Sequence, residues 1–439
     1  MSEVGMNEAG TNEVGVTWAG THVFEAPALV RPDSVAEIQR VVTGADRVRA
    51  LGTRHSFNDI ADSTGTLVTL VEPTELPVVD ASRRTVEVPA GMRYGVLAQH
   101  LEAAGLALHN LGSLPHISVA GATATGTHGS GVGNGSLSTA VAALEFVDGR
   151  GELVRVSRGD EGFDGIVVHL GALGIVTRVV LDVQPTYRMR QDIFVDLPWE
   201  SVLADSEAIL SSAYSVSLFA DWTGETLKQA WVKSRLAADG TAEGHLSDAD
   251  LSGGDFFGAR AATAKAMTPA GDDVDNTTVQ GGVPGPWAER LPHFRLDATP
   301  SAGDEIQSEY FVGRADAAAA LTAVRELAER IAPHLLVTEL RAIAADELWL
   351  SPAYHRESLA IHFTWLNRPE AVRELLPLIE EALAPFAPRP HWGKWFTLEA
   401  AQIVPQYERF DDFVALADGF DPRRRFRNAY LERVLGLPL

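Results

Sequence analysis

Apolar and polar residues recur with two different periods along this chain, which predicts a protein of mixed helices and strands. Up to residue 185, two segments have helical spacing, 35–41 and 94–104. Ser34 is placed to cap the first helix, with Glu37 at the capping-box position, and Gly105 is placed to end the second. Short apolar runs predict strands at 47–51, 65–71, 85–88, 139–147, 152–156 and 173–183, of which the fourth and fifth are expected to pair.

The pattern changes near Tyr187. Residues 237–287 are dominated by Gly, Asp, Ala, Thr and Pro with weak periodicity, so this long segment is expected to wrap the surface or cover a cleft. Helices are predicted at 315–331 and 370–386. Together with the strands this indicates an α+β arrangement, in which helices cover one face of an antiparallel sheet. The strands are predicted at 191–197, 215–222, 229–233, 335–343, 359–365 and 393–398.

Three of these strands carry polar side chains on one face. Residues two apart in a strand point the same way, so Glu339 lies with Arg341, and His362 lies with Thr364. Lys394 is expected on the polar face of the last strand. If the strands are neighbours, these groups form one cluster of donors and acceptors that suits a small polyhydroxylated ligand. The alternative is an ordinary solvated sheet face with a cross-strand salt bridge.

Two glycine-rich motifs lie about seventy residues apart in the first half, GTRHSFN at 52–58 and SVAGATATGTHGSG at 118–131. Glycine lets the chain bend sharply and approach a ligand closely, so each loop can direct consecutive backbone N–H groups at one anion. Two such loops suit a pyrophosphate. The stretch 129–135 lacks the third glycine of a G-x-G-x-x-G fingerprint, so a dinucleotide-binding Rossmann unit is not indicated.

Composition argues against several classes of function. With 36 basic and 59 acidic residues the net charge is −23, which argues against binding to nucleic acid or to anionic membranes. There is no Cys, which excludes disulfides and a cysteine nucleophile and fits a cytoplasmic protein. No metal-ligand motif is found, and no metal is expected. Residues 1–15 lack the apolar core of a signal peptide and are interpreted as a disordered tail, and no apolar run is long enough to span a membrane.

Several segments resemble the alditol oxidases, also called xylitol oxidases, of the vanillyl-alcohol oxidase family of flavoproteins. The resemblance runs from about residue 16 to the end and depends on motifs at 51–58, 110–121, 125–135, 339–346, 362–365 and 390–394. It implies three parts. These are a PCMH-type FAD-binding domain over 16–185, a substrate domain over 186–400 with an antiparallel sheet covered by helices, and a C-terminal segment, 401–439, that returns to the first domain.

The resemblance also implies where FAD would bind. His55 holds the position at which the family links the flavin covalently through its 8α-methyl group. Ser113 matches a serine that meets both flavin and substrate. The other residues implied in FAD binding are Leu51, Gly52, Thr53, Arg54, Ser56, Ser118, Gly121, Thr125, Gly126, Thr127, His128 and Ile175.

The reaction implied is hydride transfer from the terminal carbon of an alditol, such as xylitol or sorbitol, to flavin N5. Oxygen then reoxidises the flavin and gives hydrogen peroxide. Arg341 and Lys394 would stabilise the developing alkoxide, and His362 is a candidate general base. Gly112 is expected to favour reaction with oxygen by leaving space near the flavin, and a monomer is expected. The polyol would contact Ser113, Glu339, Arg341, His362, Thr364 and Lys394.

Three other functions stay open on the sequence. A sugar-lactone oxidase would share the FAD motifs, although the patterns at 339–341 and 391–394 suit it less. A reductase that uses NADPH on an enolpyruvyl nucleotide sugar would share the FAD fold but lacks the linking histidine, so His55 argues against it. A flavin-binding protein without turnover is opposed by the charged cluster on the predicted strands.

Overall fold

The computed structural model describes residues 14–244, 255–266, 273–298 and 304–439. Its N-terminal part begins with a parallel three-stranded sheet in the order β1 (Ala28–Val30), β3 (Thr66–Val68), β2 (Val48–Ala50). Helix α1 (Val35–Gly44) connects β1 to β2, and its predicted cap is confirmed because the Ser34 side chain accepts a hydrogen bond from the N–H of Glu37. Strand β2 leads directly into the glycine-rich loop at 52–58.

A five-stranded antiparallel sheet follows in the N-terminal part. Its order is β4 (Val78–Asp80), β5 (Thr85–Pro89), β9 (Gly174–Asp182), β7 (Val141–Asp148), β8 (Leu153–Ser157). The predicted pairing of β7 with β8 is confirmed. Helix α2 (Tyr94–Ala103) ends as predicted where Gly105 adopts a φ of 72°, a conformation that favours glycine. Two short helices, α3 (Val119–Ala124) and α4 (Phe163–Val167), and the strand pair of β6 (Leu106–Ala107) and β10 (Gln184–Pro185) complete this part.

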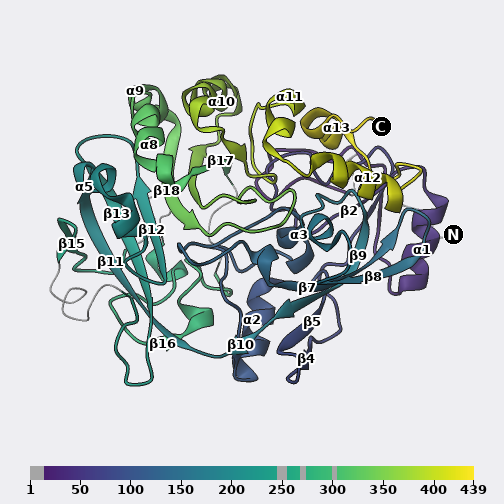
Figure 1. The fold of residues 1–439 in the computed structure, drawn as a ribbon, viewed down its shortest axis with the longest axis horizontal. Helices are drawn as coiled ribbons and strands as arrows, with labels where there is room; N and C mark the ends of the chain where they lie inside the picture. The colour runs from purple at the N-terminus through teal and green to yellow at the C-terminus, as the bar shows by residue number, and fades with distance from the viewer. Residues whose placement is uncertain (1–13, 245–254, 267–272, 299–303) are drawn as a thin grey trace, which may run out of the picture.

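The next part of the chain forms one long antiparallel sheet, seen at the left and centre of Figure 1. Its inner strands have apolar side chains on one face, such as Leu340 and Ile361, which are buried under helices α8 and α10. On this side the Tyr310 hydroxyl donates to Glu380 of α10 at 2.8 Å. The helices are α5 (Trp199–Ala204), α6 (Ser206–Leu210), α8 (Ala317–Arg325), α9 (Ala328–Ile331) and α10 (Pro369–Leu383).

The order of this sheet brings distant segments together and confirms the predicted α+β class. The sheet runs β14 (Asp255–Phe256), β15 (Ala259–Ala261), β11 (Arg188–Pro198), β13 (Thr226–Arg235), β12 (Ser215–Ala220), β18 (Leu335–Ile343), β19 (Ser358–Leu366), β17 (Glu305–Gly313), β20 (Arg389–Pro390), and β16 (Gly285–Pro286) also pairs with β11. Its central strands β18, β19 and β17 carry the polar face that matters for the site.

The C-terminal helices turn back to the N-terminal part, and in Figure 1 they lie beside α1 and β2. They are α11 (Ala400–Ile403), α12 (Phe410–Phe420) and α13 (Ala429–Leu435). The N–H of Val48 donates to the carbonyl of Arg425 at 2.9 Å. The buried guanidinium of Arg49 donates to the carbonyl of Phe426 at 2.7 Å. These bonds join the segment before the glycine-rich loop to the chain end.

Two predictions of secondary structure are wrong, and one long strand has no predicted counterpart. Residues 393–398 form no strand, because the N–H of Lys394 donates to the carbonyl of His391 in a turn and the carbonyl of Gly393 accepts from Phe57. The helix predicted at 315–331 is broken into α8 and α9. Strand β17 has no counterpart among the predicted strands, because its buried positions include Glu305 and Glu309, which resemble the polar positions of a loop.

The predicted tail at 1–15 lies mainly outside the described residues. Of its last two residues, Val14 is buried, and the carbonyl of Gly15 accepts a hydrogen bond from Phe24 at 3.2 Å. In the segment 237–287, the described part includes β14 and β15, which extend the large sheet at its edge, and the side chain of Phe256 is buried there. Within the described ranges, no helix combines the length and apolar character needed to cross a membrane.

Candidate active site

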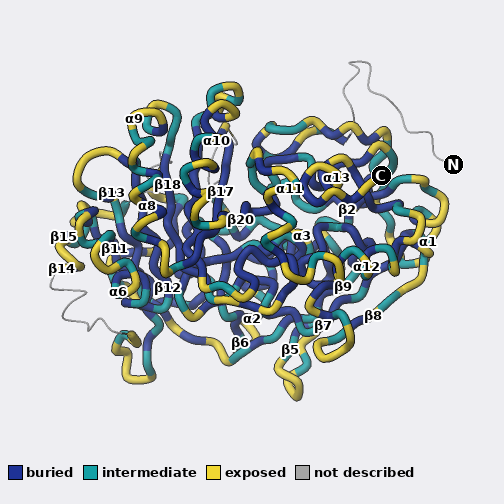
Figure 2. The backbone as a smooth tube through the Cα atoms, turned by 45° about the horizontal axis from the view of Figure 1, so that its top comes forward, coloured by how far each residue is buried: buried dark blue, intermediate teal, exposed yellow. Residues whose placement is uncertain are grey.

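A cavity lies between the glycine-rich loops of the N-terminal part and the polar face of the large sheet. Its lining extends in sequence from Thr17 to Lys394, so both halves of the chain contribute. Figure 2 shows buried, dark blue backbone running through the middle of the molecule, where the two sheets meet. The cavity therefore has two different walls, one rich in glycine and backbone groups and the other rich in charged side chains.

The first wall fits a phosphate-containing group. Among the described residues, the backbone N–H groups of residues 52–56 donate no hydrogen bond, although this loop lines the cavity. A Cβ atom on Gly52 or on Gly121 would lie 2.8 Å from Oγ of Ser118. Gly52 thus lets the first loop approach Ser118 of the second closely, and the free N–H groups form a cradle for an anion. This cradle fits the pyrophosphate of FAD.

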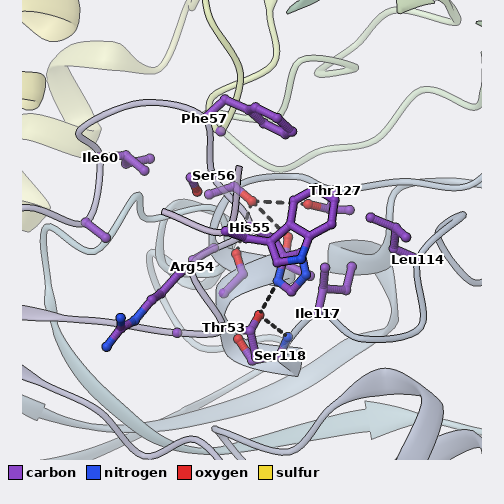
Figure 3. Close-up of a pocket in the computed structure, with 18 of the residues that line it drawn as sticks. Thr53, Arg54, His55, Ser56, Phe57, Ile60, Leu114, Ile117, Ser118 and Thr127 are labelled. Carbon is purple, nitrogen blue, oxygen red and sulfur yellow. Dashed lines mark hydrogen bonds between the residues drawn. The ribbon is translucent and has the colours of Figure 1, made fainter. Parts of the chain in front are cut away.

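His55 is held in a defined orientation in this wall. Its Nδ1 lies 3.0 Å from Oγ1 of Thr53, and the same oxygen accepts a hydrogen bond from the N–H of Ser118 at 3.2 Å. Figure 3 shows Thr53 between the two. The ring of Trp18 stacks on the imidazole at 5.3 Å. Burial, with the nearby His116 and Lys394, lowers the pKa of His55 to about 4, so the imidazole is neutral at pH 7.

Most of the residues implied in FAD binding line this cavity. Gly126 does not; its φ is 67°, and it packs against Pro352. His128 lines the cavity, but its side chain points to the large sheet, where Nε2 lies 3.0 Å from Glu309. The lining includes Leu51, Gly52, Thr53, Arg54, His55, Ser56, Ser113, Ser118, Gly121, Thr125, Thr127 and Ile175.

The second wall is built from three neighbouring strands. Glu309 of β17 and Glu339 of β18 both lie opposite His362 of β19 in the strand register. Nδ1 of His362 lies 3.2 Å from Oε2 of Glu309, and Nε2 lies 3.1 Å from Oγ1 of Thr364. The carboxylate can only accept, so Nδ1 carries the proton and Nε2 accepts from the hydroxyl. The predicted neighbourhood of Glu339, Arg341, His362 and Thr364 is confirmed.

Arg341 lies between two buried carboxylates. Its Nη2 donates to Glu309 at 2.8 Å, and its Nε lies 3.7 Å from Oε1 of Glu339. Burial alone would lower the pKa of Arg341, but Glu339 and Glu309 raise it. Its Nη1 is 3.5 Å from Oγ of Ser113, which connects the guanidinium to the first wall. A permanent cation therefore stands where the two walls meet.

Lys394 enters the cavity from the turn after β20 instead of from a strand. Its Nζ bonds to Oε1 of Gln307, and its carbonyl accepts from Asn58 at 2.8 Å. Burial lowers the pKa of Lys394 to about 8, although Glu309 opposes this change. The ammonium also lies 4.8 Å from the centre of the Phe57 ring. The side chain is thus held beside the 52–58 loop, as a cation at neutral pH.

Several residues in or directly behind this wall are absent from the sequence-based set, among them Glu305, Gln307, Glu309, His293 and Lys233. In β17, the cavity-facing Glu305, Gln307 and Glu309 alternate with Ile306 and Tyr310, which is the period of a half-buried strand. That alternation could have revealed the strand. His293 carries no comparable signal, because it follows the segment 237–287, in which periodicity is weak. Lys233 lies at the end of the strand predicted at 229–233.

Comparisons with known proteins agree with both walls. A sequence model described as FAD binding domain matches residues 26–157, and one described as D-arabinono-1,4-lactone oxidase matches residues 303–434. The chain is 44% identical to the alditol oxidase of a Streptomyces species over 421 residues, which cover 95% of this chain and 98% of that protein. It is 30% identical to the L-gulono-1,4-lactone dehydrogenase of Mycobacterium tuberculosis, with the same shares covered.

The fold has solved relatives as well. The crystal structure of cholesterol oxidase from Brevibacterium sterolicum matches with a TM-score of 0.73 and 15% identity, and the match covers 96% of both chains. At this identity the likeness concerns the fold alone. The match of residues 26–157 to the FAD binding domain model, together with the large antiparallel sheet, confirms the expected arrangement of an FAD-binding part and an antiparallel-sheet part.

Proposed function

This chain belongs to the alditol oxidase family, and from that premise we propose that it oxidises the terminal hydroxyl group of alditols with FAD as cofactor. The observation that carries the proposal is the meeting of the two walls in one cavity. The free N–H groups of 52–56 suit a pyrophosphate, and Arg341, His362 and Glu339 suit the hydroxyl groups of a polyol. FAD, held by the glycine-rich loops, would supply the acceptor for the hydride of the terminal carbon.

The charged wall has three tasks in this reaction. Arg341 and Lys394 are cations at neutral pH and stabilise negative charge on the terminal oxygen as its proton leaves. His362 accepts that proton at Nε2, the nitrogen that Thr364 contacts in the absence of substrate. Burial alone would raise the pKa of Glu339, but Arg341 and His293 hold it well below its usual range, so this carboxylate accepts hydrogen bonds from hydroxyl groups along the polyol.

The covalent link to FAD is proposed for His55. Attachment requires a neutral ring nitrogen, and burial keeps the imidazole unprotonated at pH 7. The hydrogen bond with Thr53 and the stacking against Trp18 together restrict rotation of the imidazole ring. A ring fixed in this way is prepared for one geometry of attachment.

Oxidation of a sugar lactone is the second candidate. It is favoured by the match of residues 303–434 to the model described as D-arabinono-1,4-lactone oxidase. Alditol oxidation is the preferred hypothesis, because the chain is 44% identical in sequence to the Streptomyces alditol oxidase and 30% identical to the mycobacterial lactone dehydrogenase. The two candidates share the FAD wall and differ in substrate.

One experiment separates them. Purified protein is denatured in acid to learn whether the yellow colour stays on the polypeptide. An untreated sample is then mixed anaerobically with xylitol, with sorbitol, or with a sugar lactone. Colour retained on the chain and bleached by a polyol supports covalent FAD at His55 and alditol oxidation. Bleaching by the lactone alone contradicts alditol oxidation. Colour released into the supernatant contradicts covalent attachment of FAD to His55.

Further parts of the proposal concern the setting of the reaction. Xylitol and sorbitol are proposed as substrates, O2 as electron acceptor with hydrogen peroxide as product, and the cytoplasm as location. A monomer is proposed, and no nucleic-acid or membrane partner is expected. The division into an FAD-binding domain at 16–185, a substrate domain at 186–400 and a returning segment at 401–439 is proposed on the same basis.

A further inference from the structure

Glu309 is an anion enclosed by the machinery of the site. Its side chain is 1% exposed, and three groups from three parts of the chain bond to it. Oε1 accepts from Nη2 of Arg341 at 2.8 Å and lies 3.0 Å from Nε2 of His128. Oε2 lies 3.2 Å from Nδ1 of His362.

The surroundings of Glu309 keep it ionised. Burial alone would raise its pKa, but Arg341, His128 and His362 together hold the pKa well below its usual range. Nε2 of His128 faces this carboxylate, which can only accept, so His128 contributes as a hydrogen-bond donor through that nitrogen.

We propose that Glu309 is the positioning residue of the reaction: it holds His362 in the tautomer protonated at Nδ1 and stabilises the positive charge that His362 gains from the substrate. This inference rests on the proposed function. In the step, the terminal O–H bond breaks and its proton goes to Nε2 of His362. The C–H electron pair leaves with its hydrogen to FAD, and the carbinol becomes a carbonyl.

The charge argument follows from the groups that face His362. Arg341 and Lys394 are cations and oppose protonation of the imidazole, and burial opposes it as well. Glu339 stands opposite His362 in the register, but its hydrogen bond goes to His293 at 2.8 Å and not to His362. Glu309 is the described carboxylate that contacts His362 directly. Without its charge, the imidazole has little tendency to take a proton.

The alternative role is structural, in which Glu309 only balances the buried guanidinium of Arg341. The two roles predict a different dependence of the Glu309 effect on His362. A positioning role acts through His362, so its effect disappears when His362 is absent. A structural role persists, because Arg341 remains.

The test uses the Glu309→Gln and His362→Asn variants and their double variant, each loaded with FAD. The rate of anaerobic flavin bleaching by the polyol is followed against pH. Glu380→Gln is the matched control, because Glu380 is also a buried carboxylate but bonds to Tyr310 and Thr397 on the helix side of the sheet. The expected loss for Glu309→Gln is about 10²-fold in rate, the scale of general-base catalysis. In the plot of bleaching rate against pH, the fall in rate on the acid side is expected to move to lower pH in Glu309→Gln. Glu380→Gln is expected to bleach at the wild-type rate.

In the His362→Asn background, Glu309→Gln is expected to add less than about threefold, since the two residues act as a unit. An equal loss in both backgrounds, or a wild-type rate in Glu309→Gln, overturns the proposal. If Glu309→Gln does not fold, the tautomer is read in wild-type protein from the ¹⁵N shifts of labelled histidine, assigned with His362→Asn. A proton on Nε2 with Nδ1 bare overturns the proposal. Wild-type protein that no polyol bleaches overturns the proposed function, which is a separate result because it precedes every variant.

Discussion

Lys233 and His293 meet behind the charged wall, with 2.9 Å between Nζ and Nδ1. The opposite nitrogen of the same imidazole lies 2.8 Å from Glu339, and the Lys233 ammonium also donates to the carbonyl of Leu291. The donors therefore point in one direction, from the lysine through the histidine to the carboxylate. Lys233 thus orients Glu339 from outside the cavity lining.

Replacing Lys233 by Met should change how stability depends on pH. Burial lowers the pKa of Lys233 to about 7, below the value of about 10.4 in the unfolded chain. Between these pH values the unfolded chain binds more protons than the folded chain. The lysine therefore makes the free energy of unfolding of the wild-type protein increase with pH. Lys233→Met loses this contribution, and the free energy of unfolding relative to wild type should fall by about 1 kcal/mol per pH unit between pH 7 and 9. Urea titrations at several pH values measure it, and parallel curves for the two proteins would contradict it.

Lys394 should limit activity at high pH. Burial lowers its pKa to about 8, so the ammonium that stabilises the terminal oxygen is present below that pH and lost above it. The value of kcat/KM for the polyol should therefore fall above about pH 8. Lys394→Arg should remove this limb because a guanidinium stays charged, and Lys394→Met should lower kcat/KM by about 10²-fold at pH 7. A limb that persists at the same pH in Lys394→Arg assigns the titration to another group.

Gly112 should control reaction with oxygen. A Cβ atom there would lie 3.7 Å from the carbonyl of His128 and 3.7 Å from Cδ1 of Ile117, both ordinary contacts, so alanine is accommodated. A branched side chain would extend further into the cavity that Gly112 and Ser113 line. Gly112→Val should slow flavin reoxidation on the order of tenfold, which corresponds to about 1.4 kcal/mol in the barrier, and leave anaerobic bleaching closer to wild type. Stopped-flow mixing of reduced protein with oxygenated buffer measures the rate. An unchanged rate of reoxidation in Gly112→Val would contradict a role of Gly112 in the reaction with oxygen.

The hydroxyl of Thr53 should matter for attachment of FAD. It bonds to Nδ1 of His55 and to the N–H of Ser118, so Thr53→Val removes both bonds without changing the size of the side chain. A lost hydrogen bond costs about 1 kcal/mol, and the histidine ring gains freedom to turn. The fraction of FAD that remains on the chain in a denaturing gel should fall. Thr53→Ser keeps the hydroxyl and is the control; equal flavin retention in Thr53→Val and Thr53→Ser would show that orientation by Thr53 is unimportant.

Periodicity alone predicted much of the large sheet. The strand predicted at 335–343 has the same bounds as β18, and β19 differs from its prediction by one residue at each end. The period of two also identified that Glu339 shares a face with Arg341, because side chains in a strand alternate regardless of what the strand packs against. Lys394 reaches the cavity although its predicted strand is wrong, since a turn tied to the 52–58 loop carries it there.

The sequence by itself determined the class of fold, the glycine loops and the faces of individual strands, because these depend on neighbours within a few residues. The tertiary structure decided which strands are adjacent. Strand β19 lies between β18 and β17, and this order surrounds His362 with Glu339 and Glu309. Glu309 and Arg341 are 32 residues apart, and His128 and Glu309 are 181 apart. Contacts at such separations depend on how whole helices and strands pack against one another. The periodicity of apolar residues within one element therefore cannot predict them.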